Sequence, residues 1–268
     1  MEHKYLKGHI IREQIVFPFA STLVTVWDTL AMSMGVPKKQ LSVEFRDVHL
    51  YSQPVMHKQT QLKLRVALQR GTGCFEVYAD KIKVATGIIM VLKKDVNKDG
   101  IQHKESQDMT LTAEDIYDLL RERDYLYSGE FRTIEAASSS LNEASLVWLD
   151  NWVTFIDGLL QLNTLRQPHD GVTLPTHIRR ISVDVEKHLK MKTDSEDKIL
   201  YKAEVLEEHE LMRCGGLMME NIRYRNLTAT NKRNMALQTL KFVSHFQVDQ
   251  QVSTSLQVFL QIVAENMN

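Results

Sequence analysis

The stretch FASTLVTVWDTLAMSM, residues 19–34, does most to decide the fold. Its pattern predicts a helix that is apolar almost all round. Pro18 suits the first turn of that helix, and Gly35 with Pro37 suits its end. A helix that is apolar on all sides must be enclosed by other structure. The segments that follow it are therefore expected to supply a sheet that wraps it.

Strand-like segments follow this helix, and the same order of elements then recurs around a second apolar helix at 151–165. Within the first set, clean alternation of apolar and polar residues indicates a strand, and Arg70–Gly73 indicates the hairpin turn that ends it. The expected strands are 43–51, 61–69 and 74–92 (bent near 80–83) in the first half, and 177–185, 199–206 and 216–226 in the second. One buried helix followed by antiparallel strands, twice, predicts an α+β double hot-dog.

Composition shifts divide the chain into four parts. Residues 93–110 are polar and charged, as in a linker, and Thr112 with Asp115 resembles a capping box that opens a short helix ending at Arg123. We therefore expect an N-terminal hot-dog at 1–95, a linker with a short helix at 96–124 and a C-terminal hot-dog at 125–244. Residues 245–268 are expected to form a further linker and the start of a following region.

The charge balance excludes several classes of partner. Lys and Arg number 33 against 34 Asp and Glu, so the formal charge is −1, and this gives no electrostatic footprint for nucleic acid or an anionic membrane. The two cysteines show no metal-ligand spacing and fit a cytoplasmic setting. No stretch approaches the ~20 apolar residues that cross a bilayer.

His9 and Asp157 are the residues best suited to move a proton. His9 precedes an apolar, strand-like stretch that ends at Pro18, and Asp157 lies in the second apolar helix. Gln161 follows Asp157 by four residues, so both lie on the same helix face. Polar side chains on an apolar face are costly unless partnered. A base and an acid brought together from two halves are the minimum equipment for removing water from a substrate.

Two motifs carry a resemblance to a known family. His9 and Pro18 match the signature His-x3-Gly-x4-Pro, and Asp157 with Gln161 matches Asp-x3-Gln, after the lead-in Trp-Val-Thr-Phe. The segment Tyr125–Phe131 is similar to Tyr-x-Tyr-Gly-Pro-x-Phe. The chain thus resembles the dehydratase region of an animal (insect-like) type I fatty acid synthase, related to polyketide synthase dehydratases. Residues 258–266 resemble the start of the pseudo-methyltransferase region that follows it.

The resemblance implies an activity and a site. The expected enzyme is a hydro-lyase that turns a 3-hydroxyacyl thioester into a trans-2-enoyl thioester, with His9 as base, Asp157 as acid and Gln161 beside the departing hydroxyl. The backbone N–H of Phe19 is expected to stabilise the oxyanion. Substrate-tunnel candidates are Pro18, Tyr127 and Phe131. The resemblance implies no cofactor or metal, and a substrate carried on the phosphopantetheine arm of an acyl carrier domain.

Two departures from the family keep other functions open. Glu13 stands where the family has glycine, so a positive φ there would strain the loop that carries His9. Phe19 stands where a small residue is usual and could crowd the entrance for a thioester. One alternative is therefore a catalytically impaired module that serves as a scaffold within a synthase, and a lesser one is a hot-dog thioesterase. In the favoured interpretation the chain is a fragment of a multifunctional synthase and contacts neighbouring synthase domains.

Overall fold

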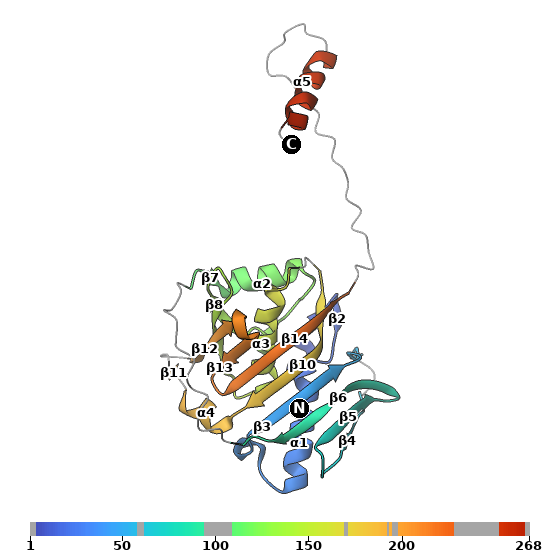
Figure 1. Ribbon diagram of the computed structural model, residues 1–268, viewed down its shortest axis with the longest axis vertical. Coiled ribbons are helices and arrows are strands. Elements are labelled where there is room, and N and C mark those ends of the chain that lie inside the picture. The colour runs from blue at the N-terminus through green and yellow to red at the C-terminus, as the bar shows by residue number, and fades with distance from the viewer. Residues whose placement is uncertain are drawn as a thin grey trace. The chain divides into compact units, whose positions relative to one another are not determined.

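Two apolar helices, α1 (Phe19–Met34) and α3 (Trp152–Leu165), form the centre of the fold. The computed structural model describes residues 4–57, 62–93, 109–168, 171–191, 193–194, 198–227 and 252–265. Both central helices lie behind one large antiparallel sheet in the view of Figure 1. They meet through Trp27 and Trp152, whose ring centroids lie 5.5 Å apart, edge to face. Each helix is therefore enclosed by the sheet and by its counterpart, as the apolar sequences require.

The described elements follow the chain in this order. The first half contains η1 (Lys4–Gly8), β1 (Ile10–Ile11), β2 (Gln14–Ile15), α1, η2 (Lys38–Gln40), β3 (Val43–Leu50), β4 (Leu64–Leu68), β5 (Cys74–Ala79) and β6 (Ile82–Val91). The second contains β7 (Leu111–Thr112), α2 (Ala113–Glu122), η3 (Gly129–Phe131), β8 (Ile134–Ala137), β9 (Glu143–Val147), α3, β10 (Thr173–Val183), α4 (Val185–Lys190), β11 (Thr193–Asp194), β12 (Ile199–Leu206), η4 (Glu207–His209), β13 (Leu211–Cys214) and β14 (Leu217–Asn226).

The strands of both halves join into one sheet. Its order is β4-β5-β6-β3-β10-β14-β13-β12-β9-β8-β7, with β11 added beside β12. The halves meet where β3 pairs with β10, from Val43↔Val183 to His49↔His177. Residues 230–268 form a separate unit, in which α5 (Val252–Glu265) carries exposed apolar side chains such as Phe259.

A charge network crosses the border between the halves. Glu44 on β3 is buried, and it accepts hydrogen bonds from Arg180 on β10 over 2.7 and 2.9 Å and a further bond from Arg46. Arg180 also donates to Glu220 on β14 over 3.1 Å. Burial alone would raise the pKa of Glu44, but the two guanidinium groups outweigh it and hold that pKa below its usual value. Glu44 is therefore ionised and compensated at the joint.

An aromatic cage encloses His188 on α4. Its ring lies 4.0 Å from that of Tyr201, stacked, and 4.5 Å from those of both Trp148 and Trp152. The side chain is fully buried, and its Nε2 has no hydrogen-bond partner in the described part of the protein. Burial away from water lowers the pKa of His188 to about 4. His188 is therefore a neutral core residue at physiological pH.

The segment 74–92, expected to be one bent strand, contains a turn. The structure has two strands there, β5 and β6, joined by Asp80 and Lys81. Asp80 takes φ +52°, which a short polar side chain tolerates better than most. Apolar residues on both sides of so short a turn make it look like one continuous strand. Short elements such as α4, β8, β9 and β13 were not expected either.

Other expected elements match closely. The first helix spans 19–34 as expected, and α2 begins with the expected capping box, in which Thr112 Oγ1 accepts from Asp115 N–H and Asp115 Oδ2 accepts from Thr112 N–H. Most of the expected linker, residues 94–108, lies outside the described residues, as do residues 245–251. In the described part of the chain, no helix is both long enough and apolar enough to cross a membrane.

Candidate active site

His9 is positioned by the short hairpin of β1 and β2. Val16 N–H donates to His9 O over 3.0 Å, and His9 Nδ1 lies 2.8 Å from Val16 O. A carbonyl oxygen only accepts hydrogen bonds, so Nδ1 carries the ring proton. In the neutral imidazole, Nε2 is then left with its lone pair, which is the form that a general base requires.

Backbone hydrogen bonds join this hairpin to the second half. Leu126 N–H donates to Ile10 O over 2.8 Å, and Ser128 N–H donates to Gly8 O over 2.9 Å. The approach is so close that a Cβ at Gly8 would overlap the carbonyl oxygen of Ser128. The residue before His9 must therefore be glycine. Nothing in the sequence singles out Gly8, because Ser128, which it touches, lies 120 residues away in the chain.

Asp157 and Gln161 project from the middle of α3 toward His9. Both are almost fully buried, at 4% and 2% exposure. Asp157 Oδ1 lies 3.5 Å from His9 Nε2, so the structure brings together the two residues singled out in the sequence. Gln161 Nε2 donates to Asp157 Oδ2 over 2.7 Å and to Phe131 O over 3.0 Å. Since Oδ2 already accepts a hydrogen bond, Oδ1 is the oxygen free to hold a proton.

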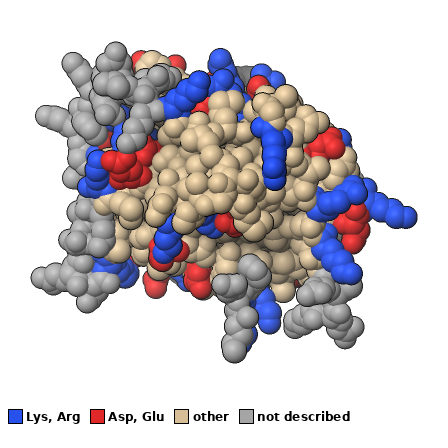
Figure 2. Space-filling view, turned by 90° about the horizontal axis from the view of Figure 1, so that it is seen from below, with Lys and Arg blue, Asp and Glu red and all other residues tan. Residues whose placement is uncertain are grey.

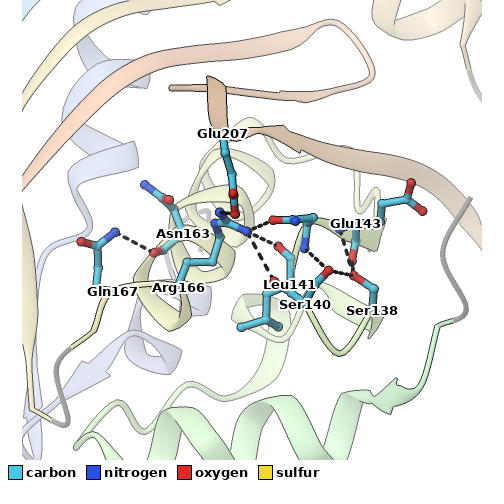
Figure 3. Close-up of polar contacts among 9 residues, drawn as sticks. Ser138, Ser140, Leu141, Glu143, Asn163, Arg166, Gln167 and Glu207 are labelled. Carbon is cyan, nitrogen blue, oxygen red and sulfur yellow. Dashed lines mark hydrogen bonds and ion pairs between the residues drawn. The ribbon is translucent and has the colours of Figure 1, made fainter. Parts of the chain in front are cut away.

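The C-terminal end of α3 is held by Arg166. Its guanidinium donates to Glu207 Oε1 over 2.7 Å and to Leu141 O over 3.2 Å, and it also contacts the side-chain oxygen of Asn142. Figure 3 shows Arg166 reaching from the helix between η4 and the β8–β9 turn. At the other end, the Asn151 side chain caps α3 by accepting from Val153 N–H over 3.0 Å. The helix that carries the acid is therefore fixed at both ends.

Aromatic rings enclose His9. The ring centroids of Tyr127 and Phe131 lie 5.2 and 5.1 Å from that of His9. Burial raises the pKa of Tyr127 well above its usual value, and the carboxylate of Asp157 adds to the effect. Tyr127 therefore stays neutral and contributes to an apolar wall around the pair.

Pro18 and Phe19 start α1, directly after the hairpin that carries His9. Pro18 is the N-cap, and its carbonyl accepts from Ser21 and Thr22 N–H over 3.1 and 3.4 Å. Phe19 is the first helical residue, and its side chain is buried. The first N–H groups of a helix have no partner within it and lie at the positive end of the dipole. The Phe19 N–H thus belongs to a set of backbone donors suited to a developing oxyanion.

A cavity of about 470 Å³ lies next to the pair. It is lined by residues of η1 and α1, by Phe17, which follows the residue that holds His9, and by Val153, one turn before Asp157 on α3. Neither His9 nor Asp157 is among the residues that line it in the described part of the protein. The tunnel candidates Pro18, Tyr127 and Phe131 do not line it either. The cavity and the pair are thus neighbours that are not joined.

The turn of the His9 hairpin has an unusual backbone. Arg12 has φ +50° and Glu13 φ +63°, both in the left-handed region. Two positive φ values between paired strands are the requirement of a type I′ turn, which favours glycine or asparagine. Glu13 therefore occupies a position with the very conformation for which glycine is suited, and the loop carries that strain.

Tyr117 is a second residue of the site that the sequence did not indicate. It lies on α2, with its hydroxyl 3.2 Å from Gln161 Oε1. In the sequence it is one member of an apolar face with Ile116 and Leu120, which indicates packing and nothing more. The described residues contain no group of three or more His, Cys, Asp or Glu arranged to hold a metal ion.

Comparison with known proteins identifies the fold. No family model matches the chain. Among solved structures, the dehydratase domain from the CurJ module of curacin polyketide synthase is 16% identical, with a TM-score of 0.59 over 83% of this chain and 88% of that one. The CurK dehydratase gives 0.63 at 14% identity, over 84% and 90%, and a trans-AT polyketide synthase dehydratase domain from Brevibacillus brevis gives 0.58 at 13%, over 84% and 91%. The fold is that of the polyketide synthase dehydratases.

This dehydratase fold confirms the fold class expected from the sequence, a double hot-dog of the α+β class. At identities of 13–16% the likeness is one of fold, so the chemistry has to be argued from the side chains.

The charge balance is also visible on the surface. The face drawn in Figure 2 has uncharged residues at its centre, with Lys, Arg, Asp and Glu side chains around them. This face therefore presents no field of a single sign.

Proposed function

We propose that this chain dehydrates a 3-hydroxyacyl thioester to the trans-2-enoyl thioester. The observation that carries the proposal is the pair His9 and Asp157, contributed by different halves of the fold. Nε2 of His9 faces Oδ1 of Asp157 over 3.5 Å, beside the aromatic rings of Tyr127 and Phe131. A base and an acid that face the same small volume can act on adjacent carbon atoms of one substrate.

The roles follow from the hydrogen bonds around the pair. Because Nδ1 is committed to Val16 O, His9 takes the C2 proton with Nε2. The electron pair of that C–H bond forms the C2–C3 double bond as the C3–O bond breaks. Asp157, protonated on Oδ1, gives its proton to the departing hydroxyl, which leaves as water. Transfer of the proton from His9 to Asp157 then restores both groups.

Charge that develops on the thioester oxygen needs a donor. The Phe19 N–H supports this role, because it is the first N–H of α1 and lies at the positive end of the helix dipole. A backbone donor does not depend on its own side chain. The large Phe19 side chain therefore bears on access to the site more than on stabilisation of the oxyanion.

The setting we propose is a multifunctional synthase for fatty acids, of the animal type I kind. There the substrate arrives on the phosphopantetheine arm of a partner acyl carrier domain, beside neighbouring synthase domains. The cavity of about 470 Å³ has the size of a small-molecule site and is lined in part by residues of α1 and α3. The acid–base chemistry described here needs no cofactor.

Hydration of a crotonyl thioester by the purified chain tests the proposal, since the reaction is reversible. Loss of the enoyl absorbance is followed for the wild type, His9→Ala and Asp157→Asn. We expect turnover by the wild type and a loss of about 10²–10⁴-fold in each variant. Wild-type activity that survives both substitutions would rule out the proposed roles. Release of free acid and thiol instead would indicate a thioesterase.

Two observations favour a second function, that of a catalytically impaired module kept as a scaffold. The pair is almost fully buried and does not line the neighbouring cavity, and Glu13 holds a strained conformation in the hairpin that carries His9. If this reading holds, the folded wild type is inactive. Hydration activity gained in Glu13→Gly would then indicate a site that has lost its function. If neither protein hydrates the thioester, the scaffold is favoured.

A further inference from the structure

Tyr117 reaches the site from a helix other than the two central ones. It lies on α2, a helix whose first turn is fixed by the capping box of Thr112 and Asp115. Its side chain is 3% exposed and packs beneath the guanidinium of Arg132, which lies 4.7 Å from the ring centroid. The hydroxyl ends beside Gln161. A helix that no catalytic motif includes thus delivers a polar group to the centre of the site.

The hydrogen bonds of the Tyr117 hydroxyl fix its direction. The oxygen accepts from Ile134 N–H over 3.1 Å, and the proton is directed to Gln161 Oε1 at 3.2 Å and Phe131 O at 3.3 Å. Burial raises the pKa of Tyr117, and the bond from Ile134 N–H only partly offsets this. The hydroxyl therefore keeps its proton and remains a donor over the whole working pH range.

This donor selects one of the two orientations of the Gln161 amide. With Oε1 toward Tyr117, Nε2 donates to Asp157 Oδ2 and Phe131 O over 2.7 and 3.0 Å. In the reversed orientation the amide oxygen would face two acceptor oxygens, while its NH2 group would meet a hydroxyl that already receives a bond. A buried acceptor that faces only other acceptors receives no hydrogen bond, and this lowers the stability of the folded state. The Tyr117 hydroxyl thus favours the orientation that binds Oδ2.

We propose that Tyr117 is a positioning residue that locks the Gln161 amide and thereby holds Asp157 with Oδ1 turned toward His9. Gln161 occupies Oδ2, so the transferable proton of Asp157 stays on the oxygen 3.5 Å from His9 Nε2. Without the hydroxyl, the amide can rotate and the carboxyl loses its fixed direction. The catalytic role of this lock rests on the dehydratase function proposed above.

Tyr117→Phe removes the hydroxyl and keeps the ring. Tyr125→Phe is the matched control, because Tyr125 is equally buried and its hydroxyl likewise donates to a backbone carbonyl and accepts from a backbone N–H, both of Thr173. In crotonyl thioester hydration we expect Tyr117→Phe to lower kcat about tenfold or more, with KM changed less than twofold. Tyr125→Phe should keep both constants close to wild type. Equal effects of the two substitutions on kcat would overturn the proposal.

A second measurement does not depend on activity. The Gln161 side-chain amide is observed in ¹⁵N–¹H spectra and assigned by its absence in Gln161→Leu. We expect slow hydrogen exchange of this amide in the wild type, exchange at least tenfold faster in Tyr117→Phe, and no change in Tyr125→Phe. Fast exchange in the wild type would overturn the lock even if Tyr117→Phe did not fold. A slow amide in a wild type without turnover would leave the lock standing and remove the dehydratase function.

Discussion

Replacing Gly8 by alanine should damage the site by forcing its two halves apart. The added Cβ would overlap the carbonyl oxygen of Ser128, a backbone atom that cannot rotate away. The segment that carries Gly8 and His9 must then separate from the segment around Ser128. The hydrogen bond from Ser128 N–H to Gly8 O, 2.9 Å long, is weakened or broken. His9 is displaced too, because it directly follows Gly8 in the chain.

The cost can be worked out from these contacts. Loss of one backbone hydrogen bond contributes about 1 kcal/mol. Forcing a methyl group into closely packed backbone contributes roughly 1–3 kcal/mol more. The free energy of unfolding should therefore fall by about 2–4 kcal/mol, which corresponds to a drop in Tm of roughly 4–16 °C for a unit of this size. Because displacement of a catalytic group by ~1 Å costs about 10²-fold in rate, turnover should fall by a similar factor.

Thermal unfolding and urea titration measure the change in stability, and thioester hydration measures the change in rate. Gly71→Ala is the matched control, since a Cβ at Gly71 meets nothing within 4 Å. We expect the control to melt within about 2 °C of the wild type. If Gly8→Ala melts together with the control, the close approach of the two halves beside His9 is wrong, and so is the account of why glycine is required there.

Three further perturbations test other parts of the structure. Glu13→Gly should stabilise the protein by about 1 kcal/mol in urea unfolding, because glycine adopts the positive φ that Glu13 holds beside Arg12 without strain. Burial lowers the pKa of His188 to about 4, so the unfolded chain binds a proton at this residue before the folded protein does. The folded protein therefore loses stability as the pH falls from 6.5 toward 4. Between pH 7 and 4.5 the wild type should lose about 2 kcal/mol more than His188→Phe, and parallel pH profiles would contradict this. Arg180→Leu should cost about 3 kcal/mol in urea unfolding, because it removes a main partner of buried Glu44, and adding Glu44→Gln should recover part of the loss.

The central helices and the candidate residues could be predicted because the sequence patterns that mark them are local. An apolar run bounded by Pro18 and Gly35 defines α1, and the spacing of four places Asp157 and Gln161 on one face of α3. The recurrence of one helix followed by strands gave the double hot-dog. Each helix and each motif lies within a few turns of chain, so the sequence pattern carries the information, whereas the meeting of His9 with Asp157, from different halves, was expected from the family resemblance and not from a local pattern.

The site residues that were missed, Gly8 and Tyr117, depend on contacts between distant segments. Nothing near Gly8 in the sequence indicates that Ser128 lies against it, and Tyr117 looks like an ordinary member of an apolar helix face. The turn at Asp80 was hidden by apolar residues on both sides of it. The contacts of Gly8 and Tyr117 follow from how distant segments dock, which local periodicity does not encode.

The pairing of β3 with β10 makes the two halves mechanically continuous. Domains joined by a flexible connection can swing open to admit a ligand, but a border of sheet hydrogen bonds, reinforced by Arg180 and Glu44, resists such a hinge. On the proposed function, a substrate would therefore reach the pair through small movements of side chains such as Phe17 and Val153, which line the cavity. The two halves should also melt in one cooperative transition, because separating them would strip each one of a strand neighbour.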